Sequence, residues 1–532
     1  MQKLLLLGDE AIATGAIDAG ISAVYAYPGT PSTEITEFIQ SSKEAKEKGI
    51  IATWTCNEKT AMESALGMSY CGKRVLVCMK HVGLNVAAGP FMNSSITGVN
   101  GGMIIVVADD PSMHSSQNEQ DSRYYGKFAL TPILEPSNQQ EAYDMMHYGF
   151  SLSEKYGTPV LFRITTRLAH SRAGVARKNS EKQNNLSLPS ELRQFVLLPG
   201  IAKRRYNLLL NNYNSFRSES ETSGFNELFD GQDKSIGIIA CGIAYNYLME
   251  NFPQGCPFPV LKARQYPLPL NLLENLTDIT ESILVLEEGY PIVEELVKGL
   301  LNKGIKVSGR LDGRIPRTGE LNPNIIARAF GMVDTQGLPT PELVVGRPPS
   351  LCNGCPHTDS YNALNEAMKD HPNGRVFSDI GCYTLGALPP LEAINSCVDM
   401  GASITMARGA ADAGLTPSVA VIGDSTFTHS GMTGLLDAVI AKAPITIMIL
   451  DNSTTGMTGG QPSQAFGRIV DIVKGLGVDP DHIHVINPLK KNHEENTQII
   501  KNELKYNGVS VIIPTRECIQ TLNRRMRKKF NK

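Results

Sequence analysis

The sequence predicts an α/β protein of several domains, with mainly parallel sheets flanked by helices. Three observations support this fold class. The chain has 532 residues, which is too long for a single hydrophobic core. Short apolar runs alternate with helical patterns along most of its length, which is typical of βαβ units. Its 48 glycines and its hydrophobic content of 42 % match a soluble protein of this class.

The bulk properties exclude several classes of partner. A net charge of −3 favours neither nucleic acid nor a membrane surface as a partner. The sequence contains no run of 18 apolar residues, so we expect no transmembrane helix. The four leucines at 4–7 are followed at once by acidic residues, so they predict a first strand and not a signal peptide. Ten cysteines without a secretion signal indicate a reducing, cytoplasmic setting in which thiols are free or bound to metal.

The chain divides into α/β blocks separated by polar sequence. Buried parallel strands are expected at 75–79, 103–108 and 159–164 in the first block. Strands at 235–242 and 282–289 mark a second block, and strands at 418–422, 444–450 and 509–513 mark a third. The predicted units are a first domain at 1–176, a linker with some local structure at 177–234, a middle α/β domain at 235–335, a third domain at 345–520 and a basic tail at 521–532.

A candidate diphosphate site lies in the third block. Gly423-Asp424-Ser425 stand where a buried strand turns into a helix, whose free N–H groups suit phosphate. Asn452 ends the next strand, and Mg²⁺ prefers such carboxylate and amide oxygens together with phosphate. A backbone carbonyl near Thr454 completes the expected ligands. The alternative is an ordinary βα turn in which Asp424 caps the helix.

A second candidate site residue lies far upstream. Glu58 begins a predicted helix after the apolar-leaning stretch 50–56, where burial would raise the pKa of its carboxyl group. Thiamine diphosphate needs both a Mg²⁺ site that binds its diphosphate and a distant buried carboxylate. Few other cofactors need this combination. The sequence alone favours the simpler interpretation of Glu58, an ordinary carboxylate at a helix start.

Four cysteines form a further candidate site. Cys352-x-x-Cys355 opens the third block, Cys382 follows, and Cys518 comes after its last predicted strand. Four thiolates in this arrangement can hold a [4Fe–4S] cluster or Zn²⁺, and a redox CxxC is a third reading. The remaining cysteines are expected to be small core residues: Cys56, Cys71, Cys78, Cys241, Cys256 and Cys397.

Several motifs in a fixed order resemble those of one enzyme family. They are the segments 27–34 (Tyr-Pro-Gly-Thr-Pro-Ser-Thr-Glu), 57–63, 80–85 and 352–357, followed by the Gly-Asp-Ser and Asn pair. Over nearly its whole length the chain resembles the 2-oxoacid:ferredoxin oxidoreductases of the thiamine-diphosphate superfamily. The likeness is greatest to the large (alpha) subunits of the indolepyruvate ferredoxin oxidoreductases.

This resemblance implies roles for the domains and for the candidate residues. Residues 1–176 would be the pyrimidine-binding domain, 235–335 a domain like the C-terminal domain of transketolase, and 345–520 the diphosphate- and Mg²⁺-binding domain. Glu58 would activate the cofactor through a pyrimidine ring nitrogen, and Thr30 would contact the substrate carboxylate. The other implied site residues are His81, Asn85 and His357 at the cofactor, with Cys352, Cys355, Cys382 and Cys518 as ligands of one [4Fe–4S] cluster.

The resemblance also implies an activity and partners. The reaction would be oxidative decarboxylation of an aryl-pyruvate to its acyl-CoA, with coenzyme A as co-substrate and ferredoxin as electron acceptor. A separate small (beta) subunit would close the site, in an alpha dimer or an alpha2beta2 assembly. Long forms of the alpha subunit end in a ferredoxin-like domain, whereas this chain ends at Lys532 without its cysteine runs. A non-oxidative thiamine decarboxylase or synthase and a non-catalytic interaction subunit are the alternatives.

Overall fold

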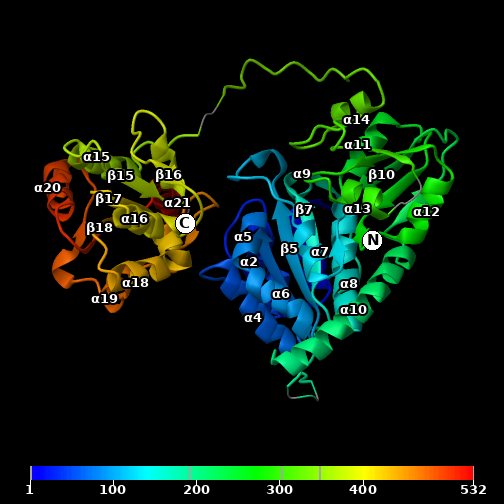
Figure 1. The fold of residues 1–532 in the computed structure, drawn as a ribbon, viewed down its shortest axis with the longest axis horizontal. Helices are drawn as coiled ribbons and strands as arrows, with labels where there is room; N and C mark the ends of the chain where they lie inside the picture. The colour runs from blue at the N-terminus through cyan, green and yellow to red at the C-terminus, as the bar shows by residue number, and fades with distance from the viewer. Residues whose placement is uncertain (1–2, 190, 192, 301–303, 347–348, 531–532) are drawn as a thin grey trace. The chain divides into compact units, whose positions relative to one another are not determined.

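A seven-stranded sheet forms the centre of the first part of the molecule (Figure 1). The computed structural model describes residues 3–189, 191, 193–300, 304–346 and 349–530. The chain divides into two compact units, residues 1–338 and 339–532. The strands of the seven-stranded sheet, in spatial order, are β12 (Gln265–Tyr266), β6 (Ile133–Leu134), β7 (Val160–Thr165), β5 (Met103–Asp109), β4 (Val75–Lys80), β2 (Ala23–Ala26) and β3 (Ile51–Trp54).

Both faces of this sheet are covered by helices, as the unbroken apolar strands predict. Neighbouring side chains of a strand point to opposite faces, so β4 contributes to two cores. Leu76 and Cys78 pack with α1 (Gly8–Asp18) and α8 (Gln139–Tyr156). Val77 and its alternate neighbours pack with α4 (Glu58–Tyr70) and α6 (Ala88–Thr97). The predicted parallel arrangement is confirmed, and only the edge strand β12 runs antiparallel to its neighbour.

The same unit holds a second, five-stranded sheet. Its order is β14 (Lys306–Ser308), β13 (Ser282–Leu286), β10 (Gly237–Cys241), β11 (Val260–Ala263) and β9 (Glu227–Phe229). Strand β12 follows β11 directly but leaves this sheet and pairs with β6 of the first sheet. The predicted first and middle domains are therefore joined in one compact unit. A short antiparallel pair, β1 (Lys3–Leu7) and β8 (Arg172–Ala176), confirms the predicted N-terminal strand.

The predicted linker at 177–234 is more ordered than its polar sequence suggested. It contains the 24-residue helix α10 (Pro199–Thr222) and ends in strand β9. Only Leu209, Phe216 and Ser220 of α10 are buried. A narrow contact with α6, α12 (Leu270–Asp278) and β12 therefore holds a mostly solvated helix. A helix with so thin an apolar stripe has a polar average composition, which is why the sequence indicated a linker. The start of the predicted basic tail likewise belongs to a helix, α21 (Ile519–Phe530).

The second unit is built on a six-stranded parallel sheet. Its order is β16 (Ser396–Cys397), β15 (Arg375–Ser378), β17 (Ser418–Gly423), β18 (Ile445–Leu450), β22 (Val509–Pro514) and β21 (Ile483–Ile486). One face of β17 and β18 packs on α16 (Ala402–Asp412) and α18 (Met432–Ile440). The other face packs on α15 (Pro356–Met368) and α20 (His493–Glu503). Because all strands run the same way, their carboxyl ends gather polar loops at one edge.

The remaining elements are short. In the first unit they are α2 (Thr33–Ser41), α3 (Lys43–Glu47), α5 (His81–Val86), η1 (Pro111–Met113), α7 (Arg123–Ala129), α9 (Thr166–His170), α11 (Ala244–Asn251), α12 (Leu270–Asp278), α13 (Ile292–Leu300) and α14 (Pro323–Ala329). In the second unit they are η2 (Cys382–Ala387), α17 (Asp424–Thr426), the π-helical turn η3 (Phe427–Gly431), β19 (Thr454–Thr455), β20 (Gln461–Pro462), α19 (Ile469–Gly475), η4 (Pro480–His482) and η5 (Lys490–Asn492).

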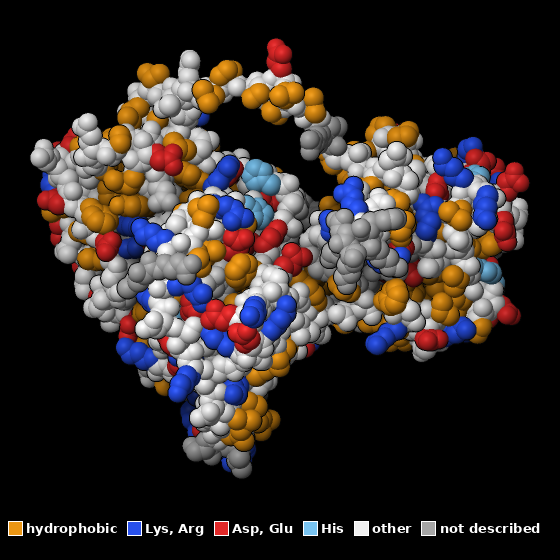
Figure 2. Space-filling view, turned by 180° about the vertical axis from the view of Figure 1, so that it is seen from behind, with side chains coloured by type: hydrophobic (Ala, Val, Ile, Leu, Met, Phe, Trp, Pro, Cys, Tyr) orange, Lys and Arg blue, Asp and Glu red, His pale blue; other side chains and the backbone are white. Residues whose placement is uncertain are grey.

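The surface fits the near-neutral composition. Figure 2 shows Lys and Arg side chains interspersed with Asp and Glu side chains over the visible face. Among the described residues, no helix has both the length and the apolar character needed to cross a membrane.

Candidate functional site

Asp424 lies at the carboxyl edge of the six-stranded sheet, where β17 passes through Gly423 into α17 and η3. Its side chain is buried, and its Oδ2 atom has no hydrogen-bond partner among the described residues. Burial raises the pKa of the Asp424 carboxyl group to about 7, and the nearby carboxylate of Asp451 adds to the rise. Two neighbouring carboxylates, one of them with an unpaired oxygen, are an environment in which a bound cation is stabilising.

Asn452 follows β18 and is held from two sides. Its Nδ2 atom lies 3.1 Å from Nε2 of His357, and its Oδ1 accepts a hydrogen bond of 3.1 Å from the backbone N–H of Thr454. Burial and the charge of Arg516 lower the pKa of His357 to about 4. The ring is therefore neutral and can accept the amide hydrogen bond. An amide oxygen has two lone pairs, so Oδ1 of Asn452 keeps one for a metal ion.

The loop after Asn452 is anchored beside the same edge. It forms a small hairpin of β19 and β20. The hydroxyl of Thr455 donates a hydrogen bond of 2.9 Å to the hydroxyl of Ser425, and that of Thr454 donates one of 2.9 Å to the carbonyl of Gln461. A carboxylate, an amide oxygen and backbone carbonyls thus lie at a helix start. This donor set fits a diphosphate-bound Mg²⁺.

The four predicted cluster ligands are brought together in this unit. Burial, together with the nearby Cys355, Cys518 and Cys352, raises the pKa of the Cys382 thiol to about 12. The guanidinium of Arg516 donates a hydrogen bond of 3.2 Å to the carbonyl of Gly354. This contact holds the CxxC turn against the chain segment that carries Cys518.

The cysteines adjoin the predicted Mg²⁺ ligands. The backbone N–H of Cys518 donates a hydrogen bond of 3.1 Å to the carbonyl of Asn452.

Glu58 is the first residue of α4 in the first unit. Asn57 caps the helix, accepting a hydrogen bond of 2.9 Å from the backbone N–H of Thr60. The Glu58 side chain is buried at 5 % exposure and lies on the backbone of α5. A Cβ atom added to Gly83 of that helix would come within 2.5 Å of Oε1 of Glu58. Because position 83 has no side chain, the carboxylate of Glu58 can occupy this space.

Two further predicted residues, His81 and Asn85, lie on the same short helix α5. Asn85 accepts a hydrogen bond of 2.7 Å from the hydroxyl of Tyr125. His81 is buried, and neither ring nitrogen has a hydrogen-bond partner among the described residues. His81, Asn85 and Glu58 thus share one region of the first unit.

Thr30 lies beside a lysine that the sequence reasoning did not single out. The hydroxyl of Ser115 donates a hydrogen bond of 3.4 Å to the carbonyl of Thr30, and Nζ of Lys80 donates one of 2.7 Å to the carbonyl of Ser115. Burial lowers the pKa of Lys80 to about 8, which the nearby Asp110 carboxylate partly counters. The sequence did contain a signal for this residue, because Lys80 stands at the end of a buried strand and directly precedes His81.

Behind this region a buried charge network joins the two sheets of the first unit. Nη2 of Arg123 lies 2.6 Å from Oδ2 of Asp121 and 3.0 Å from Oε2 of Glu287. Arg163 pairs with Asp109 at 2.6 Å. Burial raises the pKa of Glu287 to about 7, although Arg123 and two backbone N–H groups act in the opposite direction. The network therefore holds proton-binding carboxyl groups at the centre of the unit.

The predicted site residues thus form two groups. Those of the second unit are Gly423, Asp424, Ser425, Asn452, Thr454, His357, Cys352, Cys355, Cys382 and Cys518. Those of the first unit are Thr30, Glu58, His81 and Asn85. Asp451 and Lys80 join them as residues that the sequence reasoning had not selected.

Two domain families match the chain. Residues 14–195 match the thiamine-diphosphate-binding domain of pyruvate flavodoxin/ferredoxin oxidoreductases. Residues 379–513 match the C-terminal thiamine-pyrophosphate-binding domain of thiamine pyrophosphate enzymes. These ranges contain Glu58 and Asp424, respectively.

Curated relatives match over nearly the whole chain. Indolepyruvate oxidoreductase subunit IorA of Archaeoglobus fulgidus is 39 % identical over 97 % of this chain and 86 % of its own length. The proteins of the same name from Pyrococcus horikoshii and Methanothermobacter thermautotrophicus are each 38 % identical over 97 % of this chain. A solved 2-oxoglutarate:ferredoxin oxidoreductase from Magnetococcus marinus shares the fold, with a TM-score of 0.52, 15 % identity and coverage of 62 % of this chain and 65 % of its own.

Proposed function

Because this chain belongs to the indolepyruvate oxidoreductase subunit IorA family, we propose that it is the thiamine-diphosphate-binding subunit of an enzyme that oxidises aryl-pyruvates. The proposed reaction converts indolepyruvate, coenzyme A and oxidised ferredoxin into the acyl-CoA, CO₂ and reduced ferredoxin. Identity of 39 % over 97 % of the chain carries this proposal. The two matched thiamine-binding domains support it independently.

In the second unit, Asp424, Asn452 and the backbone of Thr454 would hold Mg²⁺. Gly423 and Ser425 would place backbone N–H groups against the diphosphate. The unpaired Oδ2 of Asp424 supports this assignment, because an ionised carboxylate buried without a partner is costly. His357 would act as a positioning residue, since its neutral ring fixes the amide of Asn452.

In the first unit, Glu58 would hold a proton at a ring nitrogen of the cofactor's pyrimidine. Thiamine diphosphate, when bound, supplies the thiazolium group that accepts electrons from the substrate's carboxylate-bearing carbon. The buried position of Glu58 against α5 supports its role, with His81 and Asn85 at the edge of the same region. Thr30 would bind the substrate carboxylate, and the cationic Lys80 close by would favour an anion there.

Electrons would leave through a [4Fe–4S] cluster on Cys352, Cys355, Cys382 and Cys518. The gathering of these thiols beside Asn452 supports that route. The relatives' designation as a subunit supports a separate small (beta) subunit, and we propose an alpha dimer or an alpha2beta2 assembly with ferredoxin as acceptor. None of the ten cysteines, all within the described residues, is in a disulfide. We propose a cytoplasmic location for the enzyme.

The test is an anaerobic assay of the chain with its small subunit. We expect coenzyme A-dependent reduction of ferredoxin with indolepyruvate, and slower reduction with pyruvate or 2-oxoglutarate. Glu58→Gln should bind thiamine diphosphate normally and lose at least about 100-fold in kcat. Decarboxylation without reduction of an acceptor would overturn the oxidative reaction in favour of a non-oxidative decarboxylase. An equal rate for Glu58→Gln would overturn the role of Glu58.

A further inference from the structure

One buried carboxylate outside the proposed thiamine and iron sites has no partner. Asp9, in the first turn of α1, is fully buried, and neither of its oxygens has a hydrogen-bond partner among the described residues. Burial raises the pKa of Asp9 well above its usual range, and Glu34 and Glu10 add to the rise. A carboxylate in this setting is stable only if a proton or a cation neutralises it.

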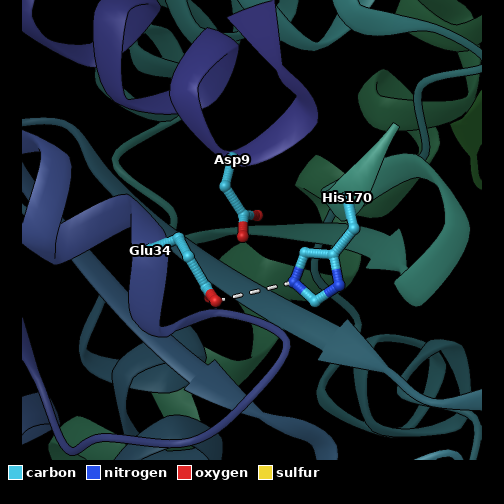
Figure 3. A group of neighbouring side chains, drawn as sticks. All are labelled: Asp9, Glu34 and His170. Atoms are coloured by element: carbon cyan, nitrogen blue, oxygen red, sulfur yellow. Dashed lines mark ion pairs between the residues drawn. The ribbon is translucent and has the colours of Figure 1, made fainter. Parts of the chain in front are cut away.

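Two other ligand-type side chains face Asp9. Figure 3 shows Asp9, Glu34 of α2 and His170 of α9 pointing toward one another. One ligand atom from each lies within 4.8 Å of the other two, and Nε2 of His170 is 3.7 Å from Oε1 of Glu34. The second carboxylate oxygen of Glu34, Oε2, also lacks a partner among the described residues. The side chains of Glu34 and His170 are each 37 % exposed, so an ion can enter from solvent.

The three residues are brought together by a close approach of helices. The backbone N–H of Gly8 donates a hydrogen bond of 3.2 Å to the carbonyl of Ser171, just past the end of α9. A Cβ atom at position 8 would come within 2.1 Å of the carbonyl oxygen of Leu168. Only glycine allows α1 to begin this close to α9, and the approach places Asp9 beside His170.

We propose that Asp9, Glu34 and His170 bind a divalent transition-metal ion, distinct from the Mg²⁺ of the thiamine site. The two carboxylates would neutralise the charge of the ion. An imidazole ligand favours Zn²⁺ or Fe²⁺ over Mg²⁺, which prefers an all-oxygen shell. Water would complete the coordination on the exposed side, because the protein offers three ligands.

The ion would brace the loop that carries Thr30. Helix α2 begins three residues after Thr30, and α1, α2 and α9 would each supply one ligand. Helix α9 is also linked to that loop indirectly, through Asp110 and Ser115. The hydroxyl of Thr166 donates a hydrogen bond of 2.8 Å to Asp110, which accepts one of 2.8 Å from the backbone N–H of Ser115. The hydroxyl of Ser115 in turn reaches the carbonyl of Thr30. The ion would therefore have a structural role, which is to hold the loop of Thr30 in position.

The experiment measures zinc bound by the full chain, purified anaerobically with its iron and saturated with Mg²⁺ and thiamine diphosphate. After incubation with Zn²⁺ and gel filtration, we expect the wild type to retain about one more zinc ion per chain than Asp9→Asn. Iron and thiamine content should be equal in the two proteins. His170→Ala, at a partly exposed position, is the second variant and should also lose this ion. Glu37→Gln, an exposed position on the same helix α2, is the matched control and should keep it.

Thermal unfolding gives an independent readout. Zn²⁺ should raise the midpoint of the wild type and of Glu37→Gln, and leave those of Asp9→Asn and His170→Ala unchanged, because only a bound ion stabilises the folded state. Equal zinc content in wild type, Asp9→Asn and His170→Ala would overturn the proposal. So would a wild type that binds no additional zinc while Asp9→Asn is the more stable protein. That result would assign a shared proton to Asp9 and Glu34.

Discussion

Gly83 and Glu58 are in such close contact that a Cβ atom at position 83 would lie 2.5 Å from Oε1 of the carboxylate. The two residues belong to different helices: Gly83 lies on α5 and Glu58 begins α4. Helix α5 presents its bare backbone at Gly83 to the side chain of Glu58. The position of the proposed activating carboxylate therefore depends on the absence of a methyl group.

Gly83→Ala should lower activity without preventing folding. The added methyl group displaces the carboxylate of Glu58, so we expect a loss of about 100-fold or more in kcat, close to that of Glu58→Gln. The cost in stability should stay within about 3 kcal/mol, as for other overpacking substitutions. Gly89→Ala, on the following helix, is the matched control because, among the described residues outside that helix's own backbone, nothing lies within 4 Å of its added methyl group. Steady-state kinetics and bound thiamine would be measured on both. Full activity in Gly83→Ala would show that Glu58 does not need this position.

His357→Ala should weaken Mg²⁺ binding more than it weakens the fold. Removing the ring frees the amide of Asn452 to rotate away from the metal. Loss of such an outer contact typically costs 10- to 100-fold in metal affinity, and we expect an effect of about that size. The measurement is the Mg²⁺ concentration needed for half-maximal thiamine binding. His371→Ala in the same unit serves as control, and an unchanged Mg²⁺ requirement in His357→Ala would contradict the positioning role.

Cys382→Ser should remove iron and leave thiamine binding in place. The four clustered thiols would share one [4Fe–4S] group, and loss of one ligand should strongly lower iron and sulfide content. Cys397→Ser is the control, because its thiol lies on the carbonyl of Asp379 and outside the four-cysteine set. Iron, sulfide and zinc are measured on anaerobically purified protein. Wild-type protein with zinc and no iron would instead assign the cysteines to zinc.

The stability of the first unit should fall as pH rises from about 5 to above 7. Glu287 has a pKa of about 7 when folded, against 4.5 for an ordinary glutamate, so the folded chain keeps a proton that the unfolded chain loses. The contribution of Glu287 to the free energy of unfolding is therefore greatest below pH 4.5, and it declines as the pH rises through 7. At about 1.4 kcal/mol for each pH unit, the largest effect is about 3 kcal/mol.

Urea unfolding followed by the fluorescence of Trp54 tests this pH dependence. Trp54 is the chain's single tryptophan and lies in β3 of the same unit. In Glu287→Gln the group cannot titrate, so the variant's free energy of unfolding should change less with pH than the wild type's, whatever its absolute stability. The exposed Glu274→Gln should follow the wild type. Identical pH profiles for wild type and Glu287→Gln would exclude Glu287 as the titrating group.

Much of the fold was predictable, because buried parallel strands carry a strong signal. The apolar runs at 75–79 and 444–450 match β4 and β18 closely. Helix α10 was not predicted, since three buried residues in 24 leave almost no periodic pattern. The pairing of β12 with the first sheet and not the second is determined by tertiary contacts, so the local sequence does not predict it. Among site residues, Lys80 was missed because its significance arises from its contacts with Ser115 and the Thr30 loop.

The pairing of β12 with β6 has a consequence for dissecting the protein. The two residues of β12, Gln265 and Tyr266, come from the middle of the chain and form an edge strand of the seven-stranded sheet. In a fragment ending at residue 176, the backbone N–H and C=O groups on the outer side of β6 would be unpaired. They could then form β-sheet hydrogen bonds with another extended chain. The first 176 residues are therefore not a separable module, and a truncated product of this length would be prone to self-association. Cotranslational folding of that sheet cannot finish until residue 266 has left the ribosome.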